Sequence, residues 1–285
     1  MPKVGIVTDS TNCLPVELIK EYDIRVGSVI LIMEGKSYRD QVDITPSEFY
    51  RRQKELREIA TTSGVSAGDF ADIFRDLSKS TDSILCLPLS KALSVTYNSA
   101  VQAREIVKAE SPNINIDIID TKTTTGSLGW IALEAARAAQ AGKSLAEVVQ
   151  VAQDMIPGVK FVAALDTLRY LVKGGRAPKV AGLFGDLIQM KPIIGMLNLS
   201  GEVEMVAKVR TKRKALVRMV EVAKKYLDPD KPAHVIVQYA DVIEEGERLK
   251  ELVTSEFNCE ELYMTEFTPV MCVHTGPLVG LAFYA

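Results

Sequence analysis

The sequence predicts an α/β protein with two domains: an N-terminal Rossmann-like parallel sheet flanked by helices, and a C-terminal mixed or antiparallel sheet with helices. In the first half, short aliphatic runs alternate with helix-like stretches, which is typical of a parallel sheet with helices on both faces. In the second half, one strand-like run alternates apolar and polar residues, which is typical of a sheet with one solvated face. The chain has 285 residues, enough for two such cores.

Four strands and four helices are expected in the first half. The strands are short β-branched or aliphatic runs, as in sheets that are buried on both faces. They cover residues 4–8, 26–33, 84–87 and 114–119. The helices between and after them cover residues 47–57, 67–77, 96–107 and 127–139. Helical spacing of small apolar residues in 96–107 indicates that this helix packs closely on the sheet.

The second half begins where one helix ends and another starts. Gly142 is typical of a helix end and Ser144 of a helix start. The later strands are expected at 159–165, 193–197, 203–209, 234–239, 262–267 and 279–284, and helices at 211–226 and 242–257. Residues 196–198 and 202–209 predict a β-hairpin around Leu199-Ser200-Gly201. We place the domain boundary at residue 157, giving domains 1–157 and 158–285, and strand 279–284 could join either.

Composition excludes several classes of protein. Hydrophobic residues make up 47% and charged residues 25%, which predicts a folded chain, and the net charge of −3 gives no field that attracts nucleic acid. The N-terminus lacks the pattern of a signal peptide, and no apolar run approaches the ~18 residues of a membrane span. The four cysteines are scattered, as in a reducing compartment. We therefore expect a cytoplasmic protein.

The common catalytic and cofactor motifs are missing. Thr8-Asp9-Ser10-Thr11-Asn12 follows the first strand in place of a glycine-rich dinucleotide turn, and the chain has neither a P-loop nor a G-x-S-x-G motif. His234 and His274 are the two histidines, and no cysteines cluster near them, so a zinc site is not expected. The sequence predicts no metal, no cofactor and no catalytic residue.

Hydroxyl-rich turns follow the expected strands, at the edge where α/β proteins bind ligands. Their side chains are Ser10 after the first strand, Thr62, Ser63 and Ser66 before a helix, Ser94 and Thr96 at a helix start, and Asp120 with Thr121 after the fourth strand. Small hydroxyls and free N–H groups at helix starts bind a carboxylate or phosphate without a cation. Taken singly, each turn is explained as well by helix capping or an Asx turn.

Together these turns resemble the pattern of the DegV family, and the resemblance runs nearly end to end. The matching segments are Thr8-Asp9-Ser10, Thr62-Ser63 with Ser66, Leu93-Ser94-Val95-Thr96-Tyr97 with Ser99-Ala100, Asp120-Thr121, Leu171-Val172-Lys173-Gly174-Gly175-Arg176, Lys191-Pro192, Val209-Arg210-Thr211 and His274-Thr275-Gly276-Pro277.

Two segments depart from the family pattern. The usual Ser-Gly-Thr reads Ser94-Val95-Thr96, and the usual Gln-Pro after Thr-Ser reads Gly64-Val65. Valine does not adopt the backbone angles that only glycine reaches. We therefore expect the turn at Ser94 to differ in detail, while the hydroxyls themselves are retained.

The resemblance implies a protein similar to the fatty acid-binding subunit of bacterial fatty acid kinase. A long-chain fatty acid would lie in a buried slot between the domains, with its carboxylate on Thr62, Ser94, Thr96 and His274. The supporting polar loops would contain Ser10, Ser63, Asp120, Thr121 and Gly276. An ATP-dependent acyl kinase partner would convert the presented carboxylate to an acyl phosphate in phospholipid metabolism, so the chain itself is not expected to be an enzyme.

Apolar walls and basic residues fit this interpretation. Residues 181–197 contain a surplus of apolar side chains for a slot, namely Leu183, Phe184, Leu187, Ile188, Met190, Ile193, Ile194 and Met196. Arg176 and Arg210, with the basic stretch 208–214, are candidate docking points for an acidic partner or for transient contact with an anionic membrane surface.

Two other functions remain open at this point. Ser94, Asp120 and His274 follow the chain order of an α/β-hydrolase triad, which would make the protein a lipid or ester hydrolase. A phosphotransferase with its own nucleotide site is the third possibility.

Overall fold

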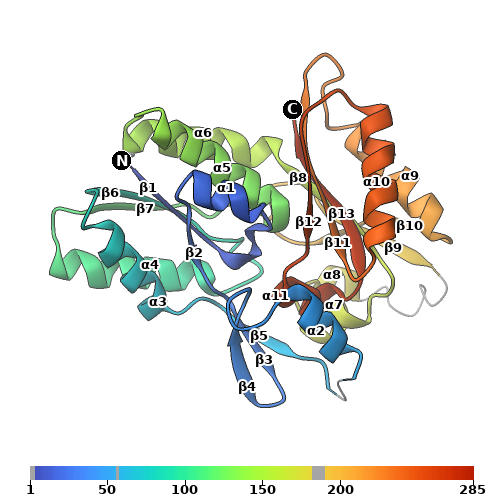
Figure 1. Ribbon diagram of the computed structural model, residues 1–285, viewed down its shortest axis with the longest axis horizontal. Coiled ribbons are helices and arrows are strands. Elements are labelled where there is room, and N and C mark those ends of the chain that lie inside the picture. Colours follow the sequence, from blue (N-terminus) through green and yellow to red (C-terminus); the bar gives the residue numbers. More distant parts are fainter. Residues whose placement is uncertain (1–3, 56–57, 182–189) are drawn as a thin grey trace.

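The structure is a computed structural model that describes residues 4–55, 58–181 and 190–285. It contains a four-stranded sheet, a six-stranded sheet and a small three-stranded sheet. Figure 1 shows the four-stranded sheet among helices on one side of the molecule and the six-stranded sheet on the other. The α/β fold class with a parallel N-terminal sheet and a mixed C-terminal sheet is therefore confirmed. The small sheet was not predicted.

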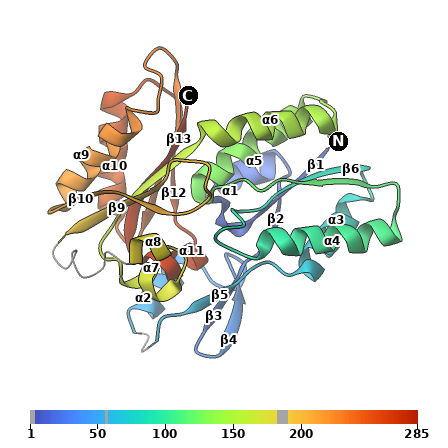
Figure 2. The same cartoon turned by 180° about the vertical axis from the view of Figure 1, so that it is seen from behind.

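The four-stranded sheet is parallel throughout, with strand order β2-β1-β6-β7. Its strands are β1 (Gly5–Asp9), β2 (Arg25–Gly27), β6 (Ser83–Leu87) and β7 (Asn115–Ile118). The helices around it are the 3-10 helix η1 (Ser10–Asn12) and the α-helices α1 (Val16–Glu21), α3 (Ala67–Leu77), α4 (Thr96–Glu110), α5 (Thr125–Gln140) and α6 (Leu145–Gly158). Helices α3 and α4 cover one face and α5 and α6 the other (Figures 1 and 2).

The prediction of one continuous strand at 26–33 is wrong. The segment forms β2 in the parallel sheet and β3 (Ile30–Met33) in the small sheet, where β3 pairs in antiparallel fashion with β4 (Lys36–Arg39) and β5 (Thr61–Ser63). The break falls at Val29, whose N–H donates to the Ser10 hydroxyl at 3.2 Å instead of to a strand. Helix α2 (Pro46–Gln53) follows, shorter than the predicted 47–57, and residues 56–57 lie outside the described residues.

The six-stranded sheet has the order β10-β9-β8-β13-β11-β12, in which only β11 and β12 are parallel neighbours. Its strands are β8 (Lys160–Leu165), β9 (Lys191–Met196), β10 (Glu204–Val209), β11 (Ala233–Ala240), β12 (Cys259–Glu266) and β13 (Leu278–Tyr284). The predicted hairpin is confirmed as β9–β10. The predicted last strand lies in the interior of this sheet, between β8 and β11. The division into domains at residue 157 stays a prediction.

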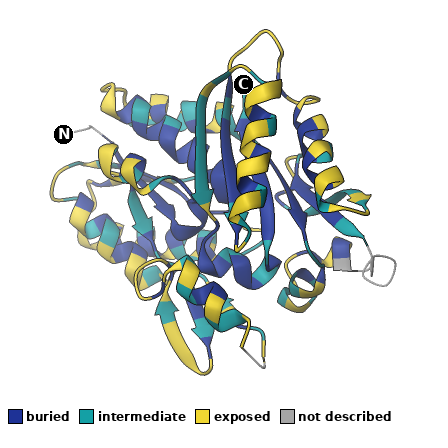
Figure 3. Ribbon diagram, turned by 45° about the vertical axis from the view of Figure 1, so that its right-hand side comes forward, coloured by how far each residue is buried: buried dark blue, intermediate teal, exposed yellow. Residues whose placement is uncertain are grey.

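Among the described residues, five helices accompany the six-stranded sheet. They are α7 (Arg169–Gly174), α8 (Pro178–Ala181), α9 (Lys212–Ala223), α10 (Ile243–Glu256) and α11 (Pro269–Thr275). Apolar residues of α9 and α10 form a cluster with one face of the sheet. Figure 3 shows the opposite faces of these two helices exposed. No helix among the described residues is long and apolar enough to cross a membrane.

Helix α5 lies between the two larger sheets and packs on both. Its central residues are small or fully buried, and Trp130 is among the largest fully buried side chains. A Cβ on Gly126 would lie 2.8 Å from the Cβ of Ala282 on β13, and a Cβ on Gly129 would lie 2.5 Å from the carbonyl oxygen of Asn12 in η1. Glycine is therefore required where the helix approaches each neighbour. Close packing on both sides fixes the relative positions of the two sheets.

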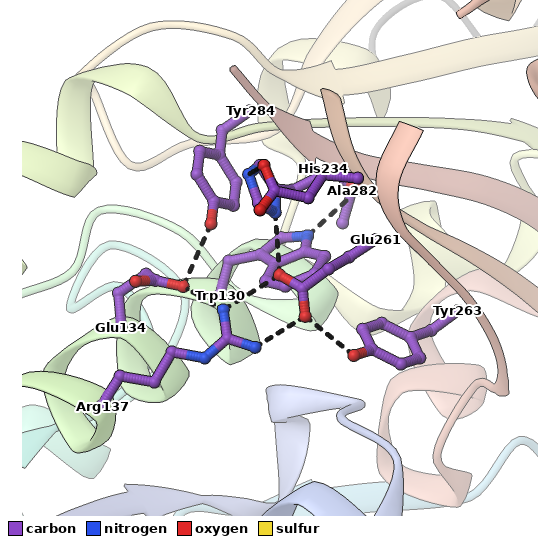
Figure 4. A network of polar contacts seen from close by, with 9 residues as sticks. Trp130, Glu134, Arg137, His234, Glu261, Tyr263, Ala282 and Tyr284 are labelled. Atoms are coloured by element: carbon purple, nitrogen blue, oxygen red, sulfur yellow. Dashed lines mark hydrogen bonds and ion pairs between the residues drawn. The ribbon is translucent and has the colours of Figure 1, made fainter. Parts of the chain in front are cut away.

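A polar network joins α5 to the edge of the six-stranded sheet (Figure 4). Arg137 donates to both carboxylate oxygens of Glu261 at 2.6 and 2.9 Å and to Glu134 at 2.7 Å. Tyr263 and His234 also bond Glu261, each at 2.8 Å. Burial raises the pKa of the Glu261 carboxyl, but the hydrogen bonds from Arg137, Tyr263 and His234 outweigh it and lower the pKa to about 2. The network holds an ionised carboxylate in place across the contact between α5 and the sheet.

We expect Arg137→Met to lower the free energy of unfolding by about 3 kcal/mol, because it leaves the half-buried Glu261 carboxylate without its cation. Arg218→Met is the control, since Arg218 pairs with Glu221 on the exposed surface of α9 and such pairs contribute about 1 kcal/mol or less. Denaturant unfolding at pH 7 measures both values. Equal losses in the two variants would show that the network contributes no more than a surface pair.

Candidate functional site

A cavity of about 470 Å³ lies where the sheets meet, lined by all three sheets or by the segments that follow their strands. Its size is within the roughly 300–1,000 Å³ of small-molecule sites. Polar residues from β5 and the start of α4 form one part of the lining, and apolar residues from β8, β9 and α11 form another. Such a surface fits a ligand with a small polar group and an apolar body.

Thr62 and His274 meet in the polar part of the lining. Thr62 lies on β5, held opposite Leu31 of β3, and His274 lies in the last turn of α11. The Thr62 Oγ1 and His274 Nε2 atoms are 2.8 Å apart. The helix containing His274 was not predicted, because only eight residues separate Phe267 from Gly276 and they contain too few turns for a periodic pattern.

Ser94 and Thr96 lie at the start of α4. Their hydroxyl oxygens are 2.9 Å apart, and the Thr96 N–H donates to the Ser94 Oγ at 3.2 Å. Thr96 is fully buried behind Ser94, which lines the cavity. Val95 between them has φ −76° and ψ −5°, in the ordinary right-handed region. Valine therefore fits this turn without backbone strain. That the turn differs in detail from the family pattern stays a prediction.

Glycine is required instead on the facing segment. A Cβ on Gly64 would lie 2.8 Å from Thr96 Oγ1, 3.1 Å from Val95 Cγ2 and 3.2 Å from Ser94 Oγ. The absence of a side chain thus lets the segment after Thr62-Ser63 touch the start of α4. Two hydroxyl turns that are about 30 residues apart in the chain become one polar surface.

The electrostatics of His274 favour a neutral ring. Burial, together with the positive charge of Arg176, lowers the pKa of the imidazole to about 4. The Nδ1 atom is buried without a hydrogen-bond partner and packs against Gly174, where a Cβ would lie 2.5 Å away. We assign the hydrogen to Nε2, because a buried lone pair at Nδ1 costs less than a buried unpaired N–H. Nε2–H then donates to Thr62, whose own hydroxyl hydrogen is free for a ligand.

The apolar part of the lining extends away from these groups. Phe161 of β8 and Phe267 stack with ring centroids 6.2 Å apart, and Ile194, Met196 and Leu171 lie in the same lining. Within the predicted apolar stretch, Ile193 instead belongs to the cluster under α9 and α10. Met190 packs on the main core. Leu183, Phe184, Leu187 and Ile188 lie outside the described residues.

The remaining predicted residues divide into two groups. Ser63 and Arg176 line the cavity. The others lie outside the lining and stabilise the loops around it. Thr121 donates to the Pro88 carbonyl at 2.8 Å, and Asp120 pairs with Lys122 at 2.9 Å. The Ser10 hydroxyl accepts from the Val29 N–H. Gly276 has φ +64° and lies against the ring of Tyr170. Arg210 is exposed at the end of β10 and does not line the cavity.

A group of threonines in the lining was not predicted from the sequence. Thr11 and Thr124 share a hydrogen bond of 3.0 Å between their hydroxyl oxygens, and Thr125 and Thr275 lie in the same lining. The run Thr123-Thr124-Thr125 directly before α5 was the signal that could have found them. Thr125 has a positive φ of 61°, which is rare for a β-branched residue.

The hydrolase triad is not assembled. Ser94 bonds Thr96, His274 bonds Thr62, and Asp120 accepts from the backbone N–H groups of Lys91 and Lys122. A triad needs the nucleophile hydrogen-bonded to the imidazole and the imidazole to the acid. The geometry therefore gives no support to the hydrolase reading. In the described part of the chain, no three His, Cys, Asp or Glu side chains are grouped to hold a metal ion.

Comparison with known proteins decides the family. The model of the DegV family, which is described as uncharacterised, matches residues 3–285. The chain belongs to the DegV family. A DegV domain-containing protein from Caldanaerobacter subterraneus is 37% identical over 224 residues, which cover 79% of this chain and 78% of that protein.

Solved DegV structures share the whole fold. A fatty acid-binding DegV protein from Thermus thermophilus superimposes with a TM-score of 0.91 at 28% identity, with all of both chains covered. A stearic acid-binding protein from Eubacterium ventriosum gives a TM-score of 0.90 at 29% identity, covering 100% of this chain and 98% of that one. Because all of this chain is covered, the similarities extend over both larger sheets.

We expect the His274 imidazole to titrate near pH 4 in the folded protein, against about 6.5 in the unfolded chain. Between these values the unfolded chain binds the extra proton and the folded protein does not. The contribution of His274 to stability is therefore lost as the pH falls from about 6.5 to 4. Two-dimensional NMR of the ring nitrogens, with His274→Gln to assign the signal, measures the midpoint. A midpoint near 6.5 would contradict the neutral ring.

Proposed function

We propose that this DegV protein binds one long-chain fatty acid, with the alkyl chain along the apolar lining and the carboxylate at Thr62, Ser94 and His274. The observation that carries this proposal is the division of one cavity into a small polar part and a larger apolar part. The Thr62 and Ser94 hydroxyls are donors that need no charge, and Thr96 supports Ser94 from behind. The fatty acid-binding activity stated for the similar structures from T. thermophilus and E. ventriosum supports the same ligand.

The alkyl chain supplies most of the affinity. Burying about fourteen methylenes at ~0.8 kcal/mol each offers roughly 11 kcal/mol before the cost of ordering the ligand. Hydrogen bonds to the carboxylate are worth about 1.5–3 kcal/mol each, and removing water from the carboxylate offsets much of that. The apolar lining therefore sets affinity, and Thr62, Ser94 and His274 set orientation and head-group selectivity.

A presenting role follows from this orientation. The polar part of the cavity includes the partly exposed Ser94 and the exposed Arg176, so the carboxylate would lie near the surface. An ATP-dependent acyl kinase partner in the cytoplasm would phosphorylate it there, and the chain itself would contribute no catalytic group. Exposed Arg176 and Arg210 would contact the acidic surface of that partner, or transiently an anionic membrane. Failure of such kinases to form acyl phosphate from the bound acid would contradict this role.

We expect native mass spectrometry of the protein purified gently from cells to show one tightly held fatty acid per chain. The apolar lining explains why the acid would survive purification, because its dissociation returns the whole alkyl chain to water. Extraction and identification of the lipid gives the chain length. Protein that carries no lipid, and that takes up none when fatty acid is added, would contradict the proposed function.

We expect Ser94→Ala to weaken fatty acid binding about tenfold to a hundredfold, because one hydrogen bond to the carboxylate is lost. Ser99→Ala is the matched control, since Ser99 lies on the same helix but does not line the cavity. Titration with a fluorescent fatty acid measures both affinities, and thermal unfolding checks that the fold is intact. Equal fatty acid affinity in Ser94→Ala and wild type would show that Ser94 does not bind the carboxylate.

A further inference from the structure

Both ends of α11 are attached to the small three-stranded sheet. At its C-terminal end, His274 bonds Thr62 of β5. At its N-terminal end, the Val270 N–H donates to the Oδ1 atom of Asp40 at 3.2 Å, and Asp40 directly follows β4. The helix has only seven residues, too few to be stable alone. Its orientation therefore depends on these end contacts.

Asp40 has an unusual environment for a carboxyl group. It is 1% exposed, and its Oδ2 atom has no hydrogen-bond partner. The hydroxyl of Thr268, the residue that begins α11, is also buried without a partner. By contrast, the neighbouring Asp9 accepts from Thr11 N, Thr11 Oγ1 and Leu89 N at 3.0, 2.6 and 2.7 Å. Asp9 has donors on both carboxylate oxygens, whereas the Oδ2 atom of Asp40 has none.

We propose that Asp40 is a positioning residue for the head-group site: it holds the N-terminal end of α11 so that His274, at the other end, reaches Thr62. The effect on ligand binding rests on the proposed function, whereas the effect on His274 does not. A second anchor lies just before the helix, where the Tyr50 hydroxyl donates to the Phe267 carbonyl at 2.5 Å. Loss of the Asp40 contact would therefore tilt α11 and would not release it.

The proton on Asp40 controls this anchor. Burial raises the pKa of the Asp40 carboxyl to about 7, and the Ser10 and Thr268 hydroxyls and the Val270 N–H only partly offset it. The other titratable groups that interact with it are Asp9 at the end of β1, Cys13 after η1 and Cys272 of α11. When protonated, Asp40 can donate to the Thr268 hydroxyl. When ionised, it places a buried negative charge beside the Asp9 carboxyl, whose own pKa is raised by burial.

The sign of the pH effect follows from the raised pKa. In the unfolded chain Asp40 titrates near its model value of 3.8, and in the folded protein near 7. Its stabilising contribution is complete below about pH 4 and is lost as the pH rises through 7. The anchor of α11 is therefore firmest in mildly acidic solution and weakens above neutrality.

Asp40→Asn and Asp40→Ala test the proposal. Asparagine keeps an acceptor for Val270 N–H and adds a donor for Thr268, but it does not titrate. In ligand-free protein, we expect the Asp40→Ala variant to shift the His274 ring signals in the NMR spectrum. The Asp40→Asn variant should preserve them. Wild type should lose thermal stability between pH 5.5 and 8 relative to asparagine. Asp43→Asn, a nearby exposed carboxyl paired with Arg39, is the control and should match wild type.

Fatty acid binding provides the second readout. We expect about tenfold weaker binding in Asp40→Ala, and a weakening from pH 6 to 8 in wild type that is absent in Asp40→Asn. Unchanged His274 signals in Asp40→Ala would overturn the proposal. The same pH dependence of fatty acid binding in Asp40→Asn as in wild type would also overturn it. If alanine does not fold, the asparagine pH profile still decides it. If wild type binds no fatty acid but the ligand-free results hold, the proposed function fails and the positioning role stands.

Discussion

Burial of α5 between the two larger sheets is the constraint on which the site depends. Gly126 and Gly129 let the helix approach β13 on one side and η1 on the other. Near the C-terminal end of the helix, Arg137 bonds Glu261 at the edge of the six-stranded sheet. The residues Thr124 and Thr125, at the start of α5, lie in the cavity lining. Because the helix fixes the distance between the sheets, it also fixes the width of the cavity. Hydroxyls from the first half of the chain can then face apolar residues from the second.

Thr62, Ser94 and His274 are neutral groups, while the cations of the cavity lining, Lys91 and Arg176, are exposed. A hydroxyl pair at Ser94 and Thr96 and a neutral imidazole behind Thr62 leave a carboxylate with directed hydrogen bonds and little net attraction. In a low-dielectric cavity an arginine or lysine would bind the carboxylate strongly but would also make it harder to release. Release of a carboxylate from neutral donors requires only that hydrogen bonds are exchanged for water.

Much of the fold could be predicted from the sequence, and the failures have physical causes. Aliphatic runs separated by amphipathic stretches located β1, β6, β7 and the β9–β10 hairpin to within a few residues, because buried strands and helix faces have strong periodicity. The run at 26–33 was predicted as one strand, but Gly27-Ser28 interrupts its aliphatic residues and is the local signal for the change of sheet at Val29. Family resemblance pointed to Thr62, Ser94 and His274, which line the cavity together. Gly64 and Gly174 were not recognised as spacers, because close approach between distant segments leaves no periodic pattern.

The position of β13 has a consequence for how the protein is made. This strand is the last one along the chain, yet it lies in the interior of the six-stranded sheet, between β8 and β11. During translation, β8 and β11 therefore emerge from the ribosome before the strand that pairs with both of them. Their facing edges stay unpaired until residues 278–284 are made. The N-terminal sheet can fold while synthesis continues. The cavity lined by both larger sheets forms only after β13 has been added, so a ligand cannot template the folding of the earlier segments.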